Sequence, residues 1–167
     1  MTLVGNYCDK LRLEKTLPHL TKDMKILDLG CGSGSITKSL NSRNFDCVGV
    51  DTYLENNHPF YKGTADKIPF PDNSFDCLIM IEVIEHIKPS CYSEINRVLK
   101  DNGIIILSTI LPKSDPFIHF LSALKIVDPY VTPHINLVKI ETLPWKLISK
   151  STILLLDQFG IFQIEKK

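Results

Sequence analysis

Gly30, Gly32 and Gly34 directly follow a short apolar run, and Asp51 closes the next run of the same kind. Glycines at this spacing let the backbone turn sharply and let a ligand approach closer than any side chain would permit. A carboxylate at the end of the following strand can accept hydrogen bonds from both hydroxyls of a ribose. The glycine turn alone is compatible with a packing turn, but together with Asp51 it predicts a site for a nucleoside cofactor.

The spacing of the glycines separates two kinds of cofactor. Gly34 follows Gly32 after a single residue, whereas the dinucleotide fingerprint has two residues at that place. Asp28 comes just before the turn, where a carboxylate attracts an ammonium group and repels a pyrophosphate. We therefore expect S-adenosylmethionine rather than a dinucleotide.

A second group of chemically capable residues, Glu82, Glu85 and His86, follows the apolar run that ends at Ile81. In a helix these three side chains would share one face, because residues three and four apart are neighbours. Two carboxylates and an imidazole can bind Mg²⁺, Mn²⁺ or Zn²⁺, with His134 as a fourth ligand. Without a metal, His86 can act as a general base near neutral pH or orient the acceptor. The sequence leaves these alternatives open.

The elements that would position these residues are buried strands. Four runs rich in Val, Ile, Leu and Cys lack polar alternation, which is typical of strands buried on both faces: 25–29, 46–50, 76–81 and 103–109. Segments with helical spacing separate them. This alternation predicts an α/β fold, a Rossmann-like doubly wound, mostly parallel sheet with helices on both faces. We expect weaker strands at 60–63 and 161–165, and a sheet truncated at its C-terminal strands.

The length of the chain predicts one domain over residues 1–167. Its last segment is expected to contain a helix that ends at Gly160. We divide the domain into an N-terminal helix (1–23), a cofactor-binding core (24–109), a candidate lid on the acceptor side (110–134), and a C-terminal helix and strand (135–167).

The candidate lid has a distinctive composition. It contains several prolines together with the aromatic residues Phe117, Phe120 and Tyr130. Such aromatic side chains either line a substrate pocket or fill the core beneath a surface helix. Both interpretations stay open at the level of the sequence.

Composition excludes several function classes. Nineteen basic residues balance nineteen acidic ones, so no overall field exists to hold a nucleic acid or an anionic membrane. The five cysteines are odd in number and scattered, which favours reduced thiols in a cytoplasmic protein over a disulfide framework. No apolar segment approaches the roughly 20 residues that span a bilayer. We expect a small-molecule substrate, with room for a protein partner.

Four segments in the same order resemble consecutive motifs of the class I S-adenosylmethionine-dependent methyltransferases: residues 26–34 (ILDLGCGSG), 49–51 (GVD), 63–76 (GTADKIPFPDNSFD) and 97–103 (RVLKDNG). The third motif is similar to the subgroup called type 11, which includes ubiquinone-biosynthesis methyltransferases. The resemblance implies transfer of a methyl group from S-adenosylmethionine to oxygen, nitrogen or carbon of an acceptor, with S-adenosylhomocysteine as the product.

The resemblance also implies roles for individual residues. Asp51 would bind the ribose, and either Thr52 or Tyr53 would flank the adenine. The family often has an aspartate where this chain has Thr64, so the adenine amino group is assigned to Asp66 and a ring nitrogen to the N–H of Ala65. Gly30 and Gly32 would form the backbone floor under the methionine part, and Asp28, Cys31 and Ile81 complete the expected cofactor contacts.

The arrangement Glu82-x-x-Glu85-His86 resembles two metal-dependent methyltransferase groups, the ubiquinone-biosynthesis O-methyltransferases and the small-RNA 3′-terminal 2′-O-methyltransferases. Both groups use it to hold a divalent cation. The wider type 11 group, however, often keeps a Glu-His pair at this place without a metal.

Two other functions fit parts of the pattern. A nicotinamide-dependent oxidoreductase is disfavoured by the glycine spacing and by the lack of room for a substrate domain. A catalytically silent methyltransferase-like subunit, which activates or scaffolds a partner, is kept as an alternative by the short chain. In that case a partner could complete the site.

Overall fold

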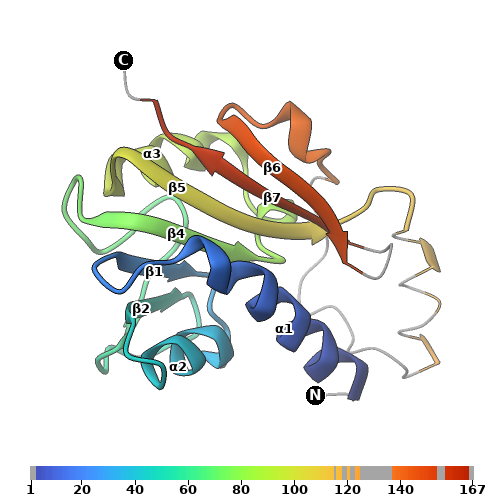
Figure 1. The fold of residues 1–167 in the computed structure, drawn as a ribbon, viewed down its shortest axis with the longest axis horizontal. Helices are drawn as coiled ribbons and strands as arrows, with labels where there is room; N and C mark the ends of the chain where they lie inside the picture. The colour runs from blue at the N-terminus through green and yellow to red at the C-terminus, as the bar shows by residue number, and fades with distance from the viewer. Residues whose placement is uncertain are drawn as a thin grey trace.

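An open, twisted sheet forms the centre of the molecule (Figure 1). The computed structural model describes residues 3–114, 116–117, 120, 123–124, 137–153 and 157–165. Within these residues the sheet has seven strands in the order β3-β2-β1-β4-β5-β7-β6. In chain order they are β1 (Lys25–Leu29), β2 (Asp46–Asp51), β3 (Phe60–Lys62), β4 (Phe75–Ile81), β5 (Leu99–Ile110), β6 (Lys146–Ile153) and β7 (Asp157–Gln163).

The central strands pair in parallel. β1 lies between β2 and β4, with Leu27 opposite Val48 on one side and Leu78 on the other. β3 extends the sheet beyond β2, and β5 extends it beyond β4, again in parallel. β7 and β6 then add two antiparallel strands. The chain order therefore reverses between β1 and β4, and open α/β sheets bind ligands at the carboxyl ends of the strands at such a point.

Helices cover both faces of the sheet, as the sequence predicts. α1 (Leu3–Thr16) and α2 (Ser35–Asn41) pack on one face, where Leu13 and Leu40 meet Ile26 and Ile79. α3 (Tyr92–Val98) packs on the opposite face. Short 3-10 helices lie at Leu17–His19, Ile84–His86, Pro89–Cys91 and Ile140–Thr142. None of the helices among the described residues is both long enough and apolar enough to cross a membrane.

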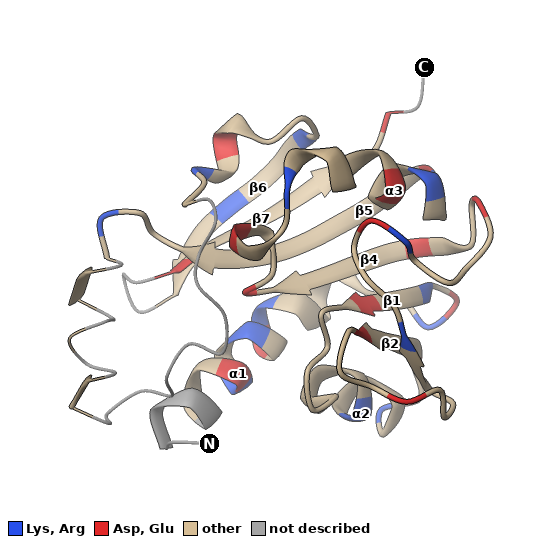
Figure 2. Cartoon of the chain, turned by 180° about the vertical axis from the view of Figure 1, so that it is seen from behind, with Lys and Arg blue, Asp and Glu red and all other residues tan. Residues whose placement is uncertain are grey.

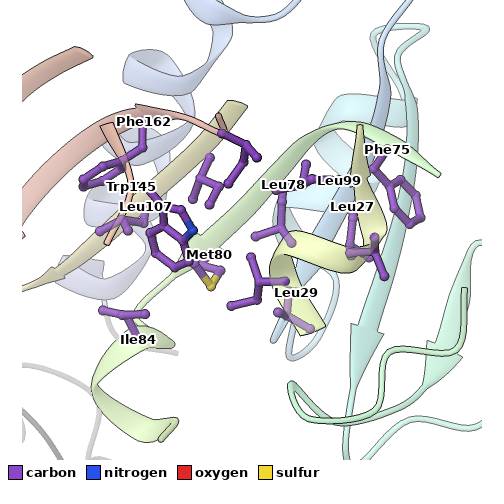
Figure 3. Close-up of a cluster of buried hydrophobic side chains, with 14 of the residues drawn as sticks. Leu27, Leu29, Phe75, Leu78, Met80, Ile84, Leu99, Leu107, Trp145 and Phe162 are labelled. Atoms are coloured by element: carbon purple, nitrogen blue, oxygen red, sulfur yellow. The ribbon is translucent and has the colours of Figure 1, made fainter. Parts of the chain in front are cut away.

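The core on the α3 face joins the central strands to the C-terminal part of the chain (Figure 3). Leu27, Leu78 and Met80 from the central strands are fully buried there. Trp145 and Phe162, from the C-terminal part, pack into the same cluster. The indole N–H of Trp145 donates to Asn96 Oδ1 at 2.7 Å, so its one polar group is satisfied. The C-terminal segment is therefore an integral part of the domain.

The sequence prediction is wrong for the C-terminal segment. No helix ends at Gly160, because this glycine lies in the middle of β7, where an added Cβ would come within 2.7 Å of the Phe162 ring. Residues 146–153, in the stretch where the helix was expected, form β6, the edge strand that pairs with β7. The expected truncation of the sheet is also wrong, because β7 and β6 extend it beyond β5. The apolar residues whose spacing suggested a helix belong instead to the paired strands β6 and β7.

The candidate lid lies largely outside the described residues. Phe117 and Phe120 are both more than half exposed. Tyr130 and His134 fall among the residues that the structure does not describe. The two interpretations of the lid aromatics therefore stay predictions.

Candidate cofactor site and active site

The glycine turn after β1 has a backbone that only glycine adopts readily. Gly30, Gly32 and Gly34 have φ angles of +74°, +52° and +77°, in the left-handed region that penalises other residues. The N–H of Gly30 donates to the carbonyl of Val50 at 2.8 Å, which ties the turn to β2. A Cβ at Gly34 would come within 2.3 Å of the Phe60 ring, whereas a Cβ at Gly32 would meet nothing within 4 Å. Gly32 therefore presents an open backbone surface.

Asp51, the last residue of β2, lies directly beside this surface. Its Oδ2 accepts a hydrogen bond from the N–H of Gly32 at 2.9 Å. Its Oδ1 accepts from the N–H of Tyr53 at 3.2 Å and from the hydroxyl of Thr52 at 3.3 Å. The carboxylate is thus held in one orientation at the carboxyl end of the sheet, where sequence analysis placed a ribose.

Asp28 is buried in β1, with its side chain against the start of α2. Its Oδ2 accepts hydrogen bonds from the N–H and the hydroxyl of Thr37, at 3.1 and 2.7 Å. Burial raises the pKa of Asp28 to about 6, and the two bonds from Thr37 counteract part of that rise. At neutral pH the carboxylate is therefore ionised but poorly solvated, an environment that a nearby cationic group would stabilise.

A cavity of about 250 Å³ lies between α1, the glycine turn and the end of β4. Asp28, Gly30, Cys31, Gly32 and Ile81 all line it. Five of the nine residues predicted to bind the cofactor therefore meet around one space. The cavity is also lined by Asp9 and Arg12 of α1 and by Glu82.

Arg12 is the residue of this site that sequence reasoning missed. Its guanidinium contacts three carboxylates: Asp157 at 2.7 Å, Glu82 at 3.3 Å and Asp9 at 3.3 Å. In Figure 2 basic and acidic segments of α1 lie close to the acidic ends of the strands. The spacing of Asp9 and Arg12 on one helix was the only local signal. Nothing in the sequence pairs Arg12 with Asp157, because the two lie near opposite ends of the chain.

Glu82, which is half-buried, and Glu85, which is buried, form a carboxyl pair at the end of β4. The hydroxyl of Ser108 donates to Glu82 Oε1 at 2.8 Å, and that of Thr109 donates to Glu85 Oε2 at 3.0 Å. Burial raises the pKa of each carboxyl to about 7, and the two groups also interact with each other. The two carboxyl groups and Arg12 therefore form one polar network, and Glu82 and Arg12 of this network line the cavity.

The expected common helical face is wrong. Glu82 lies outside any helix with a φ of +56°, and only Ile84–His86 form a short 3-10 turn. The two glutamates meet nevertheless, because the left-handed residue reverses the chain after β4. His86 is half-buried, and it is not among the residues that line the cavity.

Two atoms of this network stand out. Among the described residues, the buried side-chain nitrogen and oxygen atoms that lack a hydrogen-bond partner are Arg12 Nε and Glu85 Oε1. Buried polar atoms are nearly always paired, so unpaired ones call for an explanation. Both belong to the polar network at the end of β4. This is the part of the molecule where a ligand or solvent would complete the hydrogen bonding.

The metal site that the sequence left open as an alternative is not assembled by the described residues. They contain no group of three or more His, Cys, Asp or Glu side chains placed to hold an ion. His134, the expected fourth ligand, lies outside the described residues. A metal ion therefore stays a prediction from the resemblance and has no part in the function proposed below.

The predicted adenine contacts lie at the same edge of the sheet as Asp51. The N–H of Gly63 donates to the carbonyl of Asp51 at 3.1 Å, and a tight turn follows in which Thr64 and Lys67 bond to each other. Ala65 and Asp66 form the tip of that turn, half-buried and exposed respectively. Thr52 is also exposed, on the other side of Asp51. Thr52, Ala65 and Asp66 are not among the residues that line the cavity, so their contact with an adenine stays a prediction.

This combination of fold and site defines a class of protein. A doubly wound sheet, a glycine turn after the first strand and an acid at the end of the second are the features of class I S-adenosylmethionine-dependent methyltransferases. The comparisons agree: residues 27–107 match the family model described as a methyltransferase domain. Residues 27–107 are therefore a methyltransferase domain of type 11, and the fold is that of the class I S-adenosylmethionine-dependent methyltransferases.

Two named relatives match part of this chain in sequence, and a solved structure has the same fold. A sterol 24-C-methyltransferase of Gibberella zeae is 38% identical, over 48% of this chain and 26% of its own length. A ubiquinone biosynthesis O-methyltransferase of Rickettsia bellii is 32% identical, over 59% of this chain and 48% of its own. The crystal structure of the YcgJ protein from Bacillus subtilis has the same fold, with a TM-score of 0.67 at 19% identity over 97% of this chain and 99% of that one. The chain spans about a quarter to a half of the length of these curated relatives.

Proposed function

We propose that this chain transfers a methyl group from S-adenosylmethionine to an oxygen, nitrogen or carbon atom of a small-molecule acceptor. The observation that carries the proposal is the hydrogen bond between the N–H of Gly32 and Asp51 Oδ2. This bond places an oriented carboxylate beside an open glycine backbone, at the edge of the cavity. Asp51 provides acceptors for the ribose hydroxyls, and Gly32 provides an open backbone surface beside it. A turn that served packing alone would need neither of them.

The cavity has charges that suit the methionine end of the cofactor. A methionine group carries a carboxylate and an ammonium. Arg12 is the one cation among the residues that line the cavity, and Asp9, Asp28 and Glu82 are its acids. We assign the carboxylate to Arg12, whose Nε lacks a partner in the described residues, and the ammonium to the side of Asp28. We then assign the ribose to Asp51, and the adenine to Thr52 and to the turn that contains Ala65 and Asp66.

When bound, S-adenosylmethionine supplies a methyl group already activated on a sulfonium sulfur. The protein therefore has mainly to align the acceptor and exclude water. We assign orientation of the acceptor to Glu82, since it is the one of the three predicted catalytic residues that lines the cavity. Ser108 and Glu85 hold its carboxyl group in place. His86 is kept as a candidate base, although it is not among the residues that line the cavity.

The acceptor is proposed to be small. The named relatives include an O-methyltransferase of ubiquinone biosynthesis and a C-methyltransferase of sterols, and so cover both oxygen and carbon. The balance of nineteen basic and nineteen acidic residues supports neither a nucleic acid nor an anionic membrane as the acceptor. The five free cysteines fit the reducing cytoplasm, where we propose the protein works, and detection of the protein in a secreted fraction would oppose that location.

Calorimetric titration tests the cofactor assignment. We expect S-adenosylhomocysteine to bind the chain and NAD⁺ not to bind. Asp51→Ala should weaken S-adenosylhomocysteine by about 1.5 to 3 kcal/mol, because hydrogen bonds to a charged group are lost. Asp46→Ala is the matched control, since Asp46 is exposed at the opposite end of the same strand. Binding of NAD⁺ instead, or equal affinities for wild type and Asp51→Ala, would contradict the assignment.

A further inference from the structure

Glu94 and Arg97 of α3 form a two-pronged ion pair outside the cavity. Arg97 Nε donates to Glu94 Oε2 and Arg97 Nη2 donates to Glu94 Oε1, both at 2.8 Å. Two parallel bonds of this kind fix the direction of both side chains as well as their distance. Neither residue lines the cofactor cavity.

The pair holds the loop that leads from the adenine side of the site to β4. Glu94 Oε1 accepts the N–H of Ile68 at 2.8 Å, while Arg97 Nη2 donates to the carbonyl of Ile68 at 3.1 Å. Arg97 Nη1 donates to the carbonyl of Phe70 at 2.9 Å and to the carboxylate of Asp72 at 2.7 Å. Both backbone groups of Ile68 are thus bonded to this one ion pair.

Ile68 follows directly after the turn that contains Ala65 and Asp66. The other end of the turn begins at Gly63, whose N–H bonds to the carbonyl of Asp51. The turn is therefore fixed on one side by the ribose-binding strand and on the other by the ion pair of α3. Its own tip makes the single pair of backbone bonds between Thr64 and Lys67, so its placement depends on these two anchors.

The ion pair between Glu94 and Arg97 is expected to contribute little to the stability of the fold. The side chains of Arg97 and Glu94 are 30% and 18% exposed, and ion pairs near the surface stabilise proteins little. Burial of Ile68 and the edge-on contacts of the Phe70 ring with Tyr61 and Phe75 already attach the loop to the core. The hydrogen bonds from Glu94 and Arg97 fix the orientation of the loop backbone. Apolar packing alone would let this backbone shift by fractions of an ångström.

We propose that Glu94 and Arg97 are positioning residues that set the Ala65–Asp66 turn against the adenine ring of the cofactor and thereby determine adenine specificity from outside the site. The proposal rests on the proposed function, because it needs adenine to lie at this turn. Misplacement of a binding group by a small distance is enough to lower affinity.

The test compares two ligands that differ only in the base. S-adenosylhomocysteine carries the adenine amino group, and S-inosylhomocysteine has an oxo group in its place. We expect Arg97→Gln to weaken S-adenosylhomocysteine about tenfold or more and to reduce the preference of the protein for it over S-inosylhomocysteine. A merely structural role would weaken both ligands by the same factor. Lys100→Gln is the matched control, because its ion pair with Asp76 lies at the opposite, amino edge of the sheet.

Glu94→Gln provides an independent variant should Arg97→Gln fail to fold, and it should change the ligand preference in the same direction. An unchanged preference in the folded variants overturns the proposal, as does an equal loss for Lys100→Gln. If the wild-type chain itself does not bind S-adenosylhomocysteine, the proposed function fails. Wild-type binding with an unaltered Arg97→Gln affinity contradicts the positioning role alone.

Discussion

The N–H of Gly32 donates a 2.9 Å hydrogen bond to Asp51 Oδ2, so the turn after β1 and the acid at the end of β2 form one unit. The conformation of Gly32 and the orientation of the Asp51 carboxylate depend on each other. The left-handed backbone of Gly32 directs its N–H toward the carboxylate, and the carboxylate is oriented before any ligand arrives. Such pre-organisation reduces the free-energy cost of ordering the site on binding.

Gly32 and Gly34 of the turn should differ in what they contribute to stability and to cofactor binding. Gly34→Ala should lower the free energy of unfolding by about 3 kcal/mol, because the new Cβ would collide with the Phe60 ring and the backbone is left-handed. Gly32→Ala should cost about 1 kcal/mol of stability, since its Cβ meets nothing, but should weaken S-adenosylhomocysteine because the methyl group enters the cavity. Chemical denaturation and calorimetry measure the two effects. Equal losses of stability, or full affinity in Gly32→Ala, would be inconsistent with this division.

Removal of Arg12 should have a cost that a surface ion pair does not have. Arg12→Gln leaves Glu82 and Asp157 partly buried without their cation, so we expect a loss of about 2 to 4 kcal/mol in the free energy of unfolding. Lys10→Gln, on the same helix, breaks only the exposed pair with Glu14 and should change stability by less than about 0.5 kcal/mol. A similar small change for both variants, measured by urea denaturation, would show that the network does not stabilise the fold.

The buried carboxyl of Asp28 should make stability fall as the pH rises from about 4 to about 6. Its pKa is raised to about 6 in the folded protein, above the ordinary value of an aspartate, so the folded state holds a proton that the unfolded state has lost. The contribution of Asp28 to stability is therefore complete below pH 4 and lost on passing pH 6. Asp28→Asn can still accept both bonds from Thr37, and it should be more stable than wild type by about 1 to 3 kcal/mol at pH 7.5.

Thermal unfolding of wild type and Asp28→Asn across this pH range measures the difference. Glu82, Glu85 and Asp157 have raised pKa values as well, so both proteins share a falling background up to about pH 7. Only the difference between the two curves belongs to Asp28. Parallel curves from pH 4 to 7.5 would rule out the raised pKa.

The central part of the fold could be predicted because its strands are buried on both faces. β1, β2, β4 and β5 lie inside a parallel sheet covered by helices, so their apolar runs are continuous and easily recognised. β6 gives no such signal. It is an edge strand with exposed residues along its length, and its pairing with β7 depends on contacts that a local pattern does not contain.

The candidate site divides in the same way. Gly32 and Asp51 could be found because a short stretch of sequence carries each of them in a recognisable setting. Arg12 could not, since its partners Glu82 and Asp157 are distant in the sequence and meet only in the folded chain. The helical face predicted for Glu82 and Glu85 was wrong because tertiary contacts, including the bond from Ser108, hold Glu82 in a left-handed conformation that propensity alone disfavours.

A crystal structure of the chain with S-adenosylhomocysteine tests the central claim most directly. We predict that both ribose hydroxyls lie within hydrogen-bonding distance of the Asp51 carboxylate, and that the homocysteine part occupies the cavity with its carboxylate at Arg12. A ligand bound elsewhere, or a ribose without contact to Asp51, would contradict the claim.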